Sequence, residues 1–392
     1  MSHHVLTDGQ RALREASRKF AQRVLAPAAM ETDQQGLEFP SEILGVMAQN
    51  GFVGIDIPEE YGGQGLDILT CAVVLEELAA GWFSSTIYSM NLATDPIVAR
   101  GTEEQKRRYL PEICAGRALP CFCLTEPEAG SDAASITTSA RRDGSDYVLR
   151  GRKIYITNAH RADVLVVFAR TGLREERGGG ISIFLVDRGT PGLSIGQKFA
   201  TIAHTANPIW EVLFDDCRIP SSSLLGEEGD GFSYMQSEFG KTRAVYGARC
   251  VGVAQAALDY ALRYASQRQQ FGKPISQFQG IRFAVAEMVA QIEAARQLSY
   301  RAAVLAQEGA AEAPVAAAMA KLVASALAVQ TTGQAMQLMG GHGLIKDHPV
   351  ERYYREAKLF QIGDGTSEVL RLLISRAAND RIRDGQSARL GG

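Results

Sequence analysis

The chain lacks a long uninterrupted apolar run, an N-terminal apolar leader and an excess of charge. Its apolar runs are far shorter than the roughly 18 residues that a membrane-spanning helix needs, so we expect no membrane span. The first residues, MSHHVLTDGQRALREASRKF, predict a helix and not a signal peptide. A net charge of −3 over 392 residues gives no electrostatic reason to expect nucleic-acid binding.

The cysteines also lack the spacing of a metal site or of a redox pair. Six are present, and none forms a C-x-x-C motif. Cys121 and Cys123 would share one face of a strand, but two thiols without a nearby histidine make a poor metal site. We therefore expect six reduced thiols, no metal and a cytoplasmic protein.

The N-terminal part, up to about residue 118, has the apolar spacing of helices. Thr7 and Gln10 fit a capping box, and Pro27 is expected to end the first helix. A second helix is expected to open at Pro40-Ser41 and to end near Gly51. Pro111 is expected to interrupt a later helix that starts after Thr102.

The pattern changes at about residue 119 and again at about residue 229. Short β-type runs separated by turns occupy the middle part, which is typical of a small sandwich or barrel. Four long helical segments are expected after it, at 231–266, 275–308, 313–340 and 366–383, and these predict a helical bundle. The order is therefore α, then β, then α.

One turn stands out in the middle part. The apolar run Leu119–Leu124 predicts a strand that ends where Thr125 begins, and the turn through Asp132 contains a proline and several small residues. Its backbone N–H groups can approach a flat, polar, anionic ligand closely. An ordinary acidic surface turn fits this stretch equally well when it is taken alone.

Five motifs, taken together, resemble the acyl-CoA dehydrogenase family. In chain order they are Leu124–Asp132, Tyr155–Asn158, Arg268-x-x-Phe271-Gly272-Lys273, Gly340-Gly341-x-Gly343 and Gly365–Ser367. The resemblance implies an α+β fold with an N-terminal α-helical domain (1–118), a middle β-domain (119–228) and a C-terminal four-helix bundle (229–392). It further implies FAD, an acyl-CoA thioester substrate, an electron-transfer flavoprotein as electron acceptor, and a homo-oligomer, usually a tetramer.

The resemblance also implies a set of FAD contacts. Thr125 and Thr157 would hydrogen-bond the flavin ring, and Tyr155 stands where most relatives have Trp. The residues from Arg268 onward would hold the pyrophosphate and adenosine, partly across a subunit interface. The whole set comprises Phe122, Cys123, Leu124, Thr125, Gly130, Ser131, Tyr155, Ile156, Thr157, Arg268, Gln270, Phe271, Phe278, Gln279, Gln337, Gly340, Gly341, Thr366 and Glu368.

On the substrate side the resemblance implies that Ser131 and Arg243 meet the CoA moiety, with Gly363 and Gly365 beside the acyl group. In this chemistry a carboxylate removes the α-proton while the β-hydride passes to flavin N5. Most relatives have Glu immediately before the last Gly-Thr, and this chain has Asp364 there. Others move the Glu to the position of Thr242, so Asp364 is the remaining candidate base.

Aspartate is about 1.5 Å shorter than glutamate, and a misplacement of about 1 Å can cost roughly a hundredfold in rate. Three hypotheses remain open. Asp364 is a working base with the backbone or substrate shifted to meet it; or the protein performs enoyl-thioester reduction or a 1,4-elimination; or the dehydrogenase chemistry is lost and the fold only binds FAD or a partner. A carrier protein could replace CoA in secondary metabolism.

Two further departures bear on the substrate. Gly363 replaces the Tyr of straight-chain enzymes and predicts a branched, cyclic or bulky acyl group. The segment from Ala203 to Ile209 departs from the family's Arg-x-Ser-x-Thr pattern, which hints at an unusual substrate or carrier. Asp95, before Pro96, is a second carboxylate that altered chemistry could recruit, but the preferred interpretation is a helix-breaking turn residue.

Overall fold

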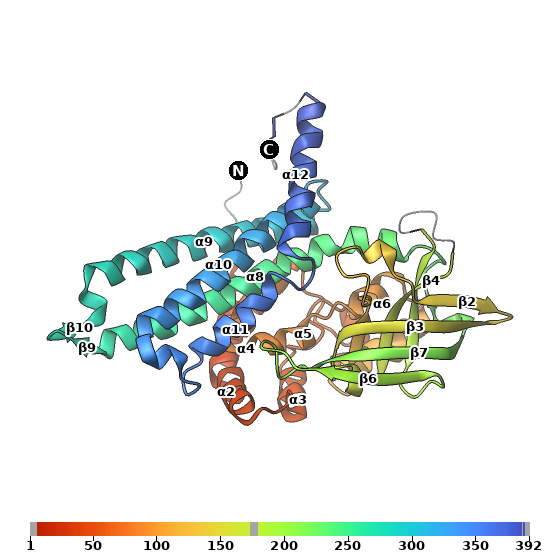
Figure 1. Ribbon diagram of the computed structural model, residues 1–392, viewed down its shortest axis with the longest axis horizontal. Helices are drawn as coiled ribbons and strands as arrows, with labels where there is room; N and C mark the ends of the chain where they lie inside the picture. Colours follow the sequence, from red (N-terminus) through yellow and green to blue (C-terminus); the bar gives the residue numbers. More distant parts are fainter. Residues whose placement is uncertain (1–5, 173–178, 386, 389–392) are drawn as a thin grey trace.

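The computed structural model describes residues 6–172, 179–385 and 387–388. Helices come first along the chain, then a sheet, then a second group of helices (Figure 1). This confirms the predicted α+β fold and its order. The predicted boundaries at 118/119 and 228/229 fall in connections between elements.

The N-terminal helices are short: the first three pack against one longer apolar helix, α4, and the last two pack against the sheet. Thr7 caps α1 with both hydrogen bonds of a capping box, as predicted, and Thr102 caps α7 in the same way. The elements are α1 (Asp8–Phe20), the π-helical turn η1 (Ala21–Leu25), α2 (Ala26–Gln35), α3 (Ser41–Gln49), α4 (Ile68–Trp82), α5 (Thr86–Ser89), α6 (Thr94–Arg100) and α7 (Glu103–Cys114).

Two predictions about prolines were wrong. Pro27 lies in the first turn of α2, where a missing N–H costs little, and the chain stays helical because the π-helical turn η1 precedes it. Pro111 lies inside α7, which continues to Cys114. The missing N–H of Pro111 removes one helical hydrogen bond, and the last three residues of α7 stay helical in spite of it.

The middle part is one sheet of eight strands in the order β6-β7-β3-β2-β4-β5-β8, with β1 parallel to β4. Only the pair Ser139–Arg170 joins β2 to β4, so the sheet folds back there and encloses a shared apolar core. The strands are β1 (Pro120–Cys123), β2 (Ser139–Asp143), β3 (Asp146–Thr157), β4 (Val164–Arg170), β5 (Ile181–Asp187), β6 (Leu193–Phe199), β7 (Ile209–Pro220) and β8 (Leu224–Leu225).

The C-terminal part has one more helix than predicted. α11 packs against α8 and α10, whereas α12 points away from the other helices (Figure 1). The elements are α8 (Gly231–Gln267), a small hairpin of β9 (Gln269–Gln270) and β10 (Lys273–Pro274), α9 (Gln279–Gln307), α10 (Ala313–Met339), α11 (Val350–Phe360) and α12 (Ser367–Arg383).

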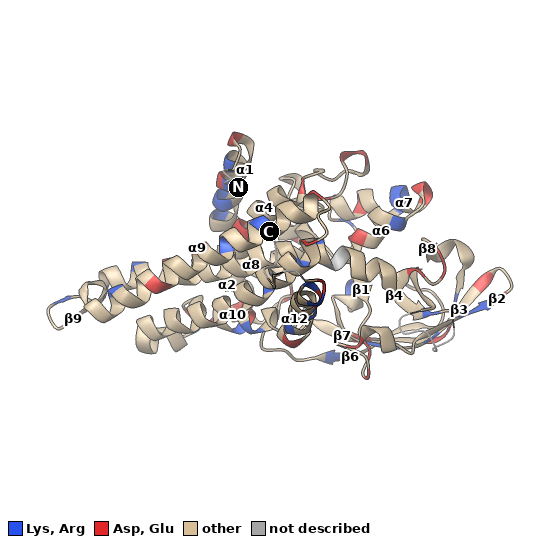
Figure 2. Ribbon diagram, turned by 90° about the horizontal axis from the view of Figure 1, so that it is seen from above, with Lys and Arg blue, Asp and Glu red and all other residues tan. Residues whose placement is uncertain are grey.

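Two stretches, Ile68–Ser89 and Ala313–Leu344, are long and apolar enough to cross a membrane by length and composition. The prediction from apolar runs alone overlooked them. In the first, 83% of the most apolar window is buried inside the protein, and in the second 56% is. Charged residues of both signs lie interspersed along α1, α7 and α12 (Figure 2).

The two helical parts are joined by a close crossing of α4 and α8. A Cβ on Gly252 of α8 would lie 2.0 Å from the carbonyl oxygen of Glu76 on α4. The buried carboxylate of Glu76 in turn accepts hydrogen bonds from Arg296 Nε and Tyr300 Oη on α9, both at 2.8 Å. This crossing sets the position of α8, which carries much of the candidate site described below.

Gly252→Ala should therefore destabilise the protein by about 2 kcal/mol or more, because the two backbones must separate. Gly45→Ala is the matched control: a Cβ on Gly45 of α3 meets no atom within 4 Å, and alanine there should stabilise by up to about 1 kcal/mol. Urea unfolding monitored by circular dichroism measures both. Equal stability of the two variants would contradict the close crossing.

Candidate functional site

Asp364 lies in the turn between α11 and α12. Its φ is +54° and that of Gly365 is +93°, so two successive residues adopt the left-handed region. Aspartate tolerates this conformation better than most residues, and glycine adopts it without strain. The turn thus presents Asp364 at the junction of α8, α10 and α11.

Two cationic side chains hold the backbone of this turn. Lys321 Nζ, on α10, donates to the carbonyl oxygens of Gly363 and Gly365, the latter at 2.5 Å. Arg243 Nε, on α8, donates to the carbonyl oxygen of Asp364 at 3.4 Å. Burial lowers the pKa of Lys321, whereas the negative charge of Asp364 acts to raise it. Three consecutive carbonyl groups are therefore fixed from two different helices.

Tyr246 occupies the space beside Gly363. A Cβ on Gly363 would lie 3.4 Å from Tyr246 Oη, and the Tyr246 ring meets Phe360 edge-on at 5.9 Å between centroids. The glycine was expected to leave room for a bulky acyl group, but a tyrosine from α8 fills part of that room. The prediction of a bulky substrate stays a prediction and has lost one of its supports.

A second group of predicted site residues lies at the end of β1. Lys153 Nζ, fully buried, donates to the carbonyl oxygen of Leu124 at 2.9 Å and to Glu126 Oε1 at 2.8 Å. The backbone N–H of Ile154 donates to the carbonyl oxygen of Thr125 at 2.9 Å. These bonds place the 124–126 turn next to the end of β3, so the two threonine-bearing segments meet.

Glu126 anchors the other side of the turn. Its carboxylate also accepts hydrogen bonds from the backbone N–H groups of Thr137 and Thr138, at 2.6 and 2.9 Å. Burial alone would raise the pKa of Glu126, but the charge of Lys153 and these hydrogen bonds hold it at about 2. Glu126 is therefore a buried carboxylate that stays ionised.

The end of β3 presents an aromatic ring to solvent. The register against β7 shifts between Lys153 and Ile156, and Tyr155 has a φ of +58° and is 55% exposed. Such a bulge re-aims one side chain out of the sheet. The side chains of Cys123 and Ile156 are buried in the sheet core, so only their backbone can face a ligand.

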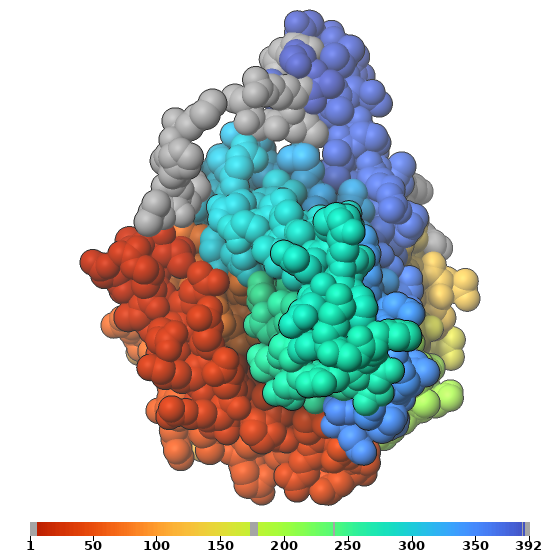
Figure 3. All heavy atoms as spheres, turned by 90° about the vertical axis from the view of Figure 1, so that its left-hand side faces the viewer, coloured from red at the N-terminus to blue at the C-terminus, as the bar shows by residue number. Residues whose placement is uncertain are grey.

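The residues from Arg268 to Gln279 lie elsewhere. They form the β9–β10 hairpin and the start of α9, at the end of the molecule opposite the sheet (Figure 1). The rings of Tyr264 and His342 contact at a tilt, with their centroids 5.5 Å apart, which brings Gln337, Gly340 and Gly341 to the same end as the hairpin. Figure 3 faces this end of the molecule. One chain therefore does not bring this group together with the 122–157 group.

The remaining predicted residues lie in two places, beside the 124–126 turn and beside the Asp364 turn. Gly130 and Ser131 are exposed beside the 124–126 turn, whereas Arg243 is buried against the Asp364 turn. Thr366 caps α12 by accepting a hydrogen bond from the N–H of Val369 at 3.3 Å, next to Asp364. Asp95 was expected in a helix-breaking turn, but it lies in the first turn of α6 and hydrogen-bonds Asp56.

Lys321, Tyr246 and Lys153 were missed from the sequence. Lys321 is fully buried and stands in an alanine-rich run of α10. A single lysine in such an apolar run is the sequence signal that could have pointed to it. All six cysteines are buried free thiols, and the described residues contain no cluster of His, Cys, Asp and Glu suited to a metal.

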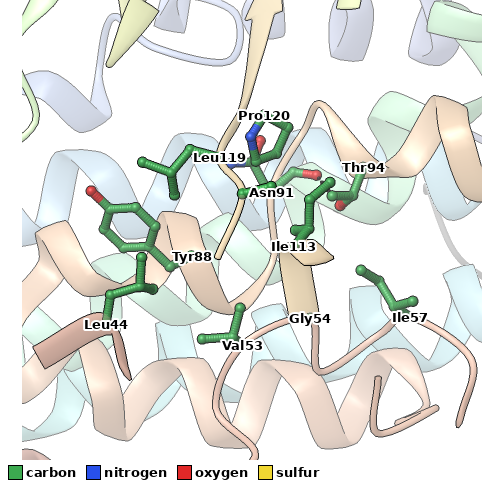
Figure 4. A pocket seen from close by; sticks show the side chains of 11 residues that line it. Leu44, Val53, Gly54, Ile57, Tyr88, Asn91, Thr94, Ile113, Leu119 and Pro120 are labelled. Atoms are coloured by element: carbon green, nitrogen blue, oxygen red, sulfur yellow. Dashed lines mark hydrogen bonds between the residues drawn. The ribbon is translucent and has the colours of Figure 1, made fainter. Parts of the chain in front are cut away.

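A small internal cavity of about 10 Å³ lies away from Asp364, beneath the start of β1 (Figure 4). It has room for about one water molecule at most. Its lining comes from Leu44, Val53, Gly54, Ile57, Tyr88, Asn91, Thr94, Ile113, Ala118, Leu119 and Pro120. None of these belongs to the helices that surround Asp364, so the cavity is separate from that site.

The chain is similar to known proteins along almost its whole length. Three acyl-CoA dehydrogenase domains match the chain: the N-terminal domain at residues 7–117, the middle domain at 121–217 and the C-terminal domain at 229–379. An acyl-CoA dehydrogenase of Bacillus subtilis is 41% identical over 95% of this chain and 98% of its own length.

Solved structures agree with the sequence matches. Butyryl-CoA dehydrogenase of Megasphaera elsdenii superposes with a TM-score of 0.90 at 38% identity, covering 96% of this chain and 99% of that one. A structure described as PigA with FAD and proline gives 0.91 at 30% identity, covering 96% and 98%.

The ionised state of Glu126 predicts a pH effect on stability. Its folded-state pKa, about 2, lies below the ordinary value of 4.5, so its contribution is present above pH 4.5 and is lost as the pH falls toward 2. Glu126→Gln should lower the unfolding free energy at pH 7 and weaken its dependence on pH across that window. Urea unfolding at a series of pH values tests this, and an unchanged slope would refute it.

Proposed function

We propose, because this chain belongs to the acyl-CoA dehydrogenase family, that it dehydrogenates an acyl thioester between its α- and β-carbons with Asp364 as the base. The family consists of FAD-dependent oxidoreductases that act on CH–CH groups. The single observation that carries the assignment of the base is the backbone clamp on residues 363–365, which fixes a carboxylate-bearing turn beside α8 and α10.

The residues present fit FAD. The exposed ring of Tyr155 offers a flat apolar surface. The adjoining segments of Thr125 and Thr157 offer hydroxyl and backbone polar groups beside it. These three residues would hold the flavin ring, and Thr366 and Glu368 would lie at its polar tail. When bound, FAD supplies a two-electron acceptor for the β-hydride.

Asp364 would remove the α-proton. Its side chain is one methylene shorter than glutamate, so the clamp matters more here than in a site with a longer base. Arg243 and Lys321 donate to backbone carbonyl oxygens of the turn, and both cations also interact electrostatically with the Asp364 carboxylate.

We propose further that the hairpin end contributes to the FAD site of a second copy of the chain. The β9–β10 hairpin lies at the end of the molecule opposite the sheet, and the sheet carries Tyr155 and Thr157 (Figure 1). Apolar side chains stand exposed at and near the hairpin end: Phe271 is 94% exposed, Leu344 75% and Phe283 60%. Burying such residues favours self-association. A homotetramer, an electron-transfer flavoprotein as acceptor and a cytoplasmic location complete the proposal.

The activity has a direct test. Anaerobic addition of saturated acyl-CoA thioesters to the FAD-loaded protein should bleach the flavin absorbance near about 450 nm. A panel of straight, branched and cyclic acyl groups, each offered also on a carrier protein, measures the preferred substrate. If no thioester bleaches the flavin, the dehydrogenase assignment is wrong; enoyl thioesters that reoxidise reduced flavin would instead favour the reverse reaction.

The base is tested by two substitutions. Asp364→Asn should reduce the bleaching rate by about 100-fold or more while FAD content is unchanged, because an amide cannot accept the proton. Asp364→Glu restores the missing methylene and should raise the rate if Asp364 acts from a shortened reach. A fully active Asp364→Asn variant would show that Asp364 is not the base that removes the α-proton.

The clamp is tested separately. Lys321→Met removes the donor to Gly363 and Gly365 but keeps an unbranched apolar stem, and it should slow flavin bleaching by roughly 10- to 100-fold. FAD content and assembly size should stay at the wild-type level, since Lys321 lies away from the hairpin end. Loss of FAD together with activity would show a structural role instead.

A further inference from the structure

Three buried polar atoms where α8 meets the N-terminal helices have no hydrogen-bond partner among the described residues. They are Asp56 Oδ1, Ser89 Oγ and Arg249 Nε. Ser89 is fully buried and Arg249 is 8% exposed. Leaving such an atom unpaired is costly, so buried polar groups without partners are uncommon in native proteins and call for an explanation.

The three atoms come from different elements that meet at one place. Arg249 Nη2, on α8, donates to the carbonyl oxygen of Met90 at 2.9 Å, and Met90 follows Ser89 at the end of α5. The N–H of Ile55 donates to the carbonyl oxygen of Ser89 at 2.9 Å, and Asp56 follows Ile55. Asp56 also hydrogen-bonds Asp95 of α6. We call Asp56, Ser89, Asp95 and Arg249 the polar cluster.

The polar cluster and the Asp364 turn contact the same helix, α8, at different positions along its length. Arg243, Tyr246 and Arg249 recur every three residues, so they share one broad face of that helix. Arg243 bonds the Asp364 backbone, Tyr246 lies beside Gly363, and Arg249 interacts electrostatically with both Asp364 and Asp56. Along the axis of α8, Arg249 lies about 4.5 Å from Tyr246 and about 9 Å from Arg243, so a short acyl chain held at Asp364 would extend toward the cluster.

The charges of the cluster disfavour an ionic ligand of either sign. Asp56 and Asp95 share a hydrogen bond, which needs a proton on one of the two carboxyl groups, so the pair carries one negative charge that the positive charge of Arg249 balances. The unpaired atoms include an N–H donor, a carboxyl oxygen and a hydroxyl. A ligand hydroxyl can accept from the first and donate to the second, which a methyl group cannot do.

The neighbouring histidine adds no charge. Burial, and after it the positive charge of Arg249, lowers the pKa of His204 to about 4, so its ring is neutral at pH 7. Its Nδ1 and Ser84 Oγ lie 3.0 Å apart in a hydrogen bond, and its ring packs on Phe83. His204 belongs to the segment whose sequence departs from the family pattern. The change thus puts a neutral ring beside Arg249.

We propose that the polar cluster binds a hydroxyl group carried near the fourth carbon of a short acyl chain, and so selects a hydroxylated acyl thioester over an apolar one. The hydroxyl accepts a hydrogen bond from Arg249 Nε and donates to Asp56 Oδ1, with Ser89 Oγ as its third neighbour. This rests on the proposed dehydrogenation at Asp364 and names the substrate class of the same site.

Four CoA thioesters of equal chain length form the test: butyryl, 4-hydroxybutyryl, 4-aminobutyryl and succinyl, which end in a methyl, hydroxyl, ammonium and carboxylate group. Anaerobic flavin bleaching and calorimetric affinity are measured for each with the FAD-loaded protein. The hydroxylated thioester should react and bind at least about 10-fold better than the other three. The same acyl groups on pantetheine keep the result independent of the carrier.

Variants assign the preference to the cluster. Ser89→Ala and Asp56→Asn should each reduce the ratio of hydroxybutyryl to butyryl rates by roughly fivefold. Thr331→Val is the matched control, because Thr331 Oγ1 on α10 is likewise buried without a partner among the described residues but lies outside the cluster. Its ratio should equal that of the wild type.

The outcomes separate the two proposals. If no thioester bleaches the flavin, the proposed function fails. If butyryl-CoA bleaches the flavin as fast as the hydroxylated thioester, the dehydrogenase stands and the cluster holds only water. A preference for succinyl or 4-aminobutyryl thioester would overturn the neutral hydroxyl in favour of an ion. A preference for the hydroxylated thioester that survives Ser89→Ala and Asp56→Asn would place the selecting groups elsewhere.

Discussion

The clamp of Lys321 and Arg243 on the carbonyl groups of residues 363–365 is the interaction on which the candidate site depends. It joins α10 and α8 to the turn after α11 through hydrogen bonds to backbone carbonyl oxygens. The same two cations interact electrostatically with the carboxylate of Asp364, so they favour an acidic side chain there. Position is supplied by the scaffold, and reach by the side chain.

Helix α8 links this clamp to everything else around the base. Its close crossing with α4 fixes its position in the fold. Arg243 bonds the turn, Tyr246 fills the space beside Gly363, and Arg249 bonds the N-terminal helical part. A single helix therefore carries the substrate-facing surface from the base to the polar cluster. In the sheet, the buried Lys153–Glu126 pair has the corresponding task of fixing the 124–126 turn.

The fold and the candidate site were predictable to different extents. The capping box at Thr7, the helix start after Thr102, the apolar strands and the long C-terminal helices are local patterns, and they appear where the sequence placed them. Strands β2 and β6 and helix α11 were missed because they are polar and are stabilised by their neighbours. Pro27 misled because it stands in the first turn of α2, where its N–H would have had no helical partner, and Pro111 misled because α7 continues past it in spite of one lost hydrogen bond.

What the sequence determined alone is the set of registered motifs, and with them the family, the cofactor and the candidate carboxylate, because short motifs carry their chemistry in residue type and spacing. Tertiary structure decided the surroundings of that carboxylate. Lys321 lies 43 positions before Asp364 and Asp56 lies 193 before Arg249, and no local pattern reports such pairings. They arise because packed helices bring distant side chains together. Burial then makes it costly to leave any of these polar groups without a partner.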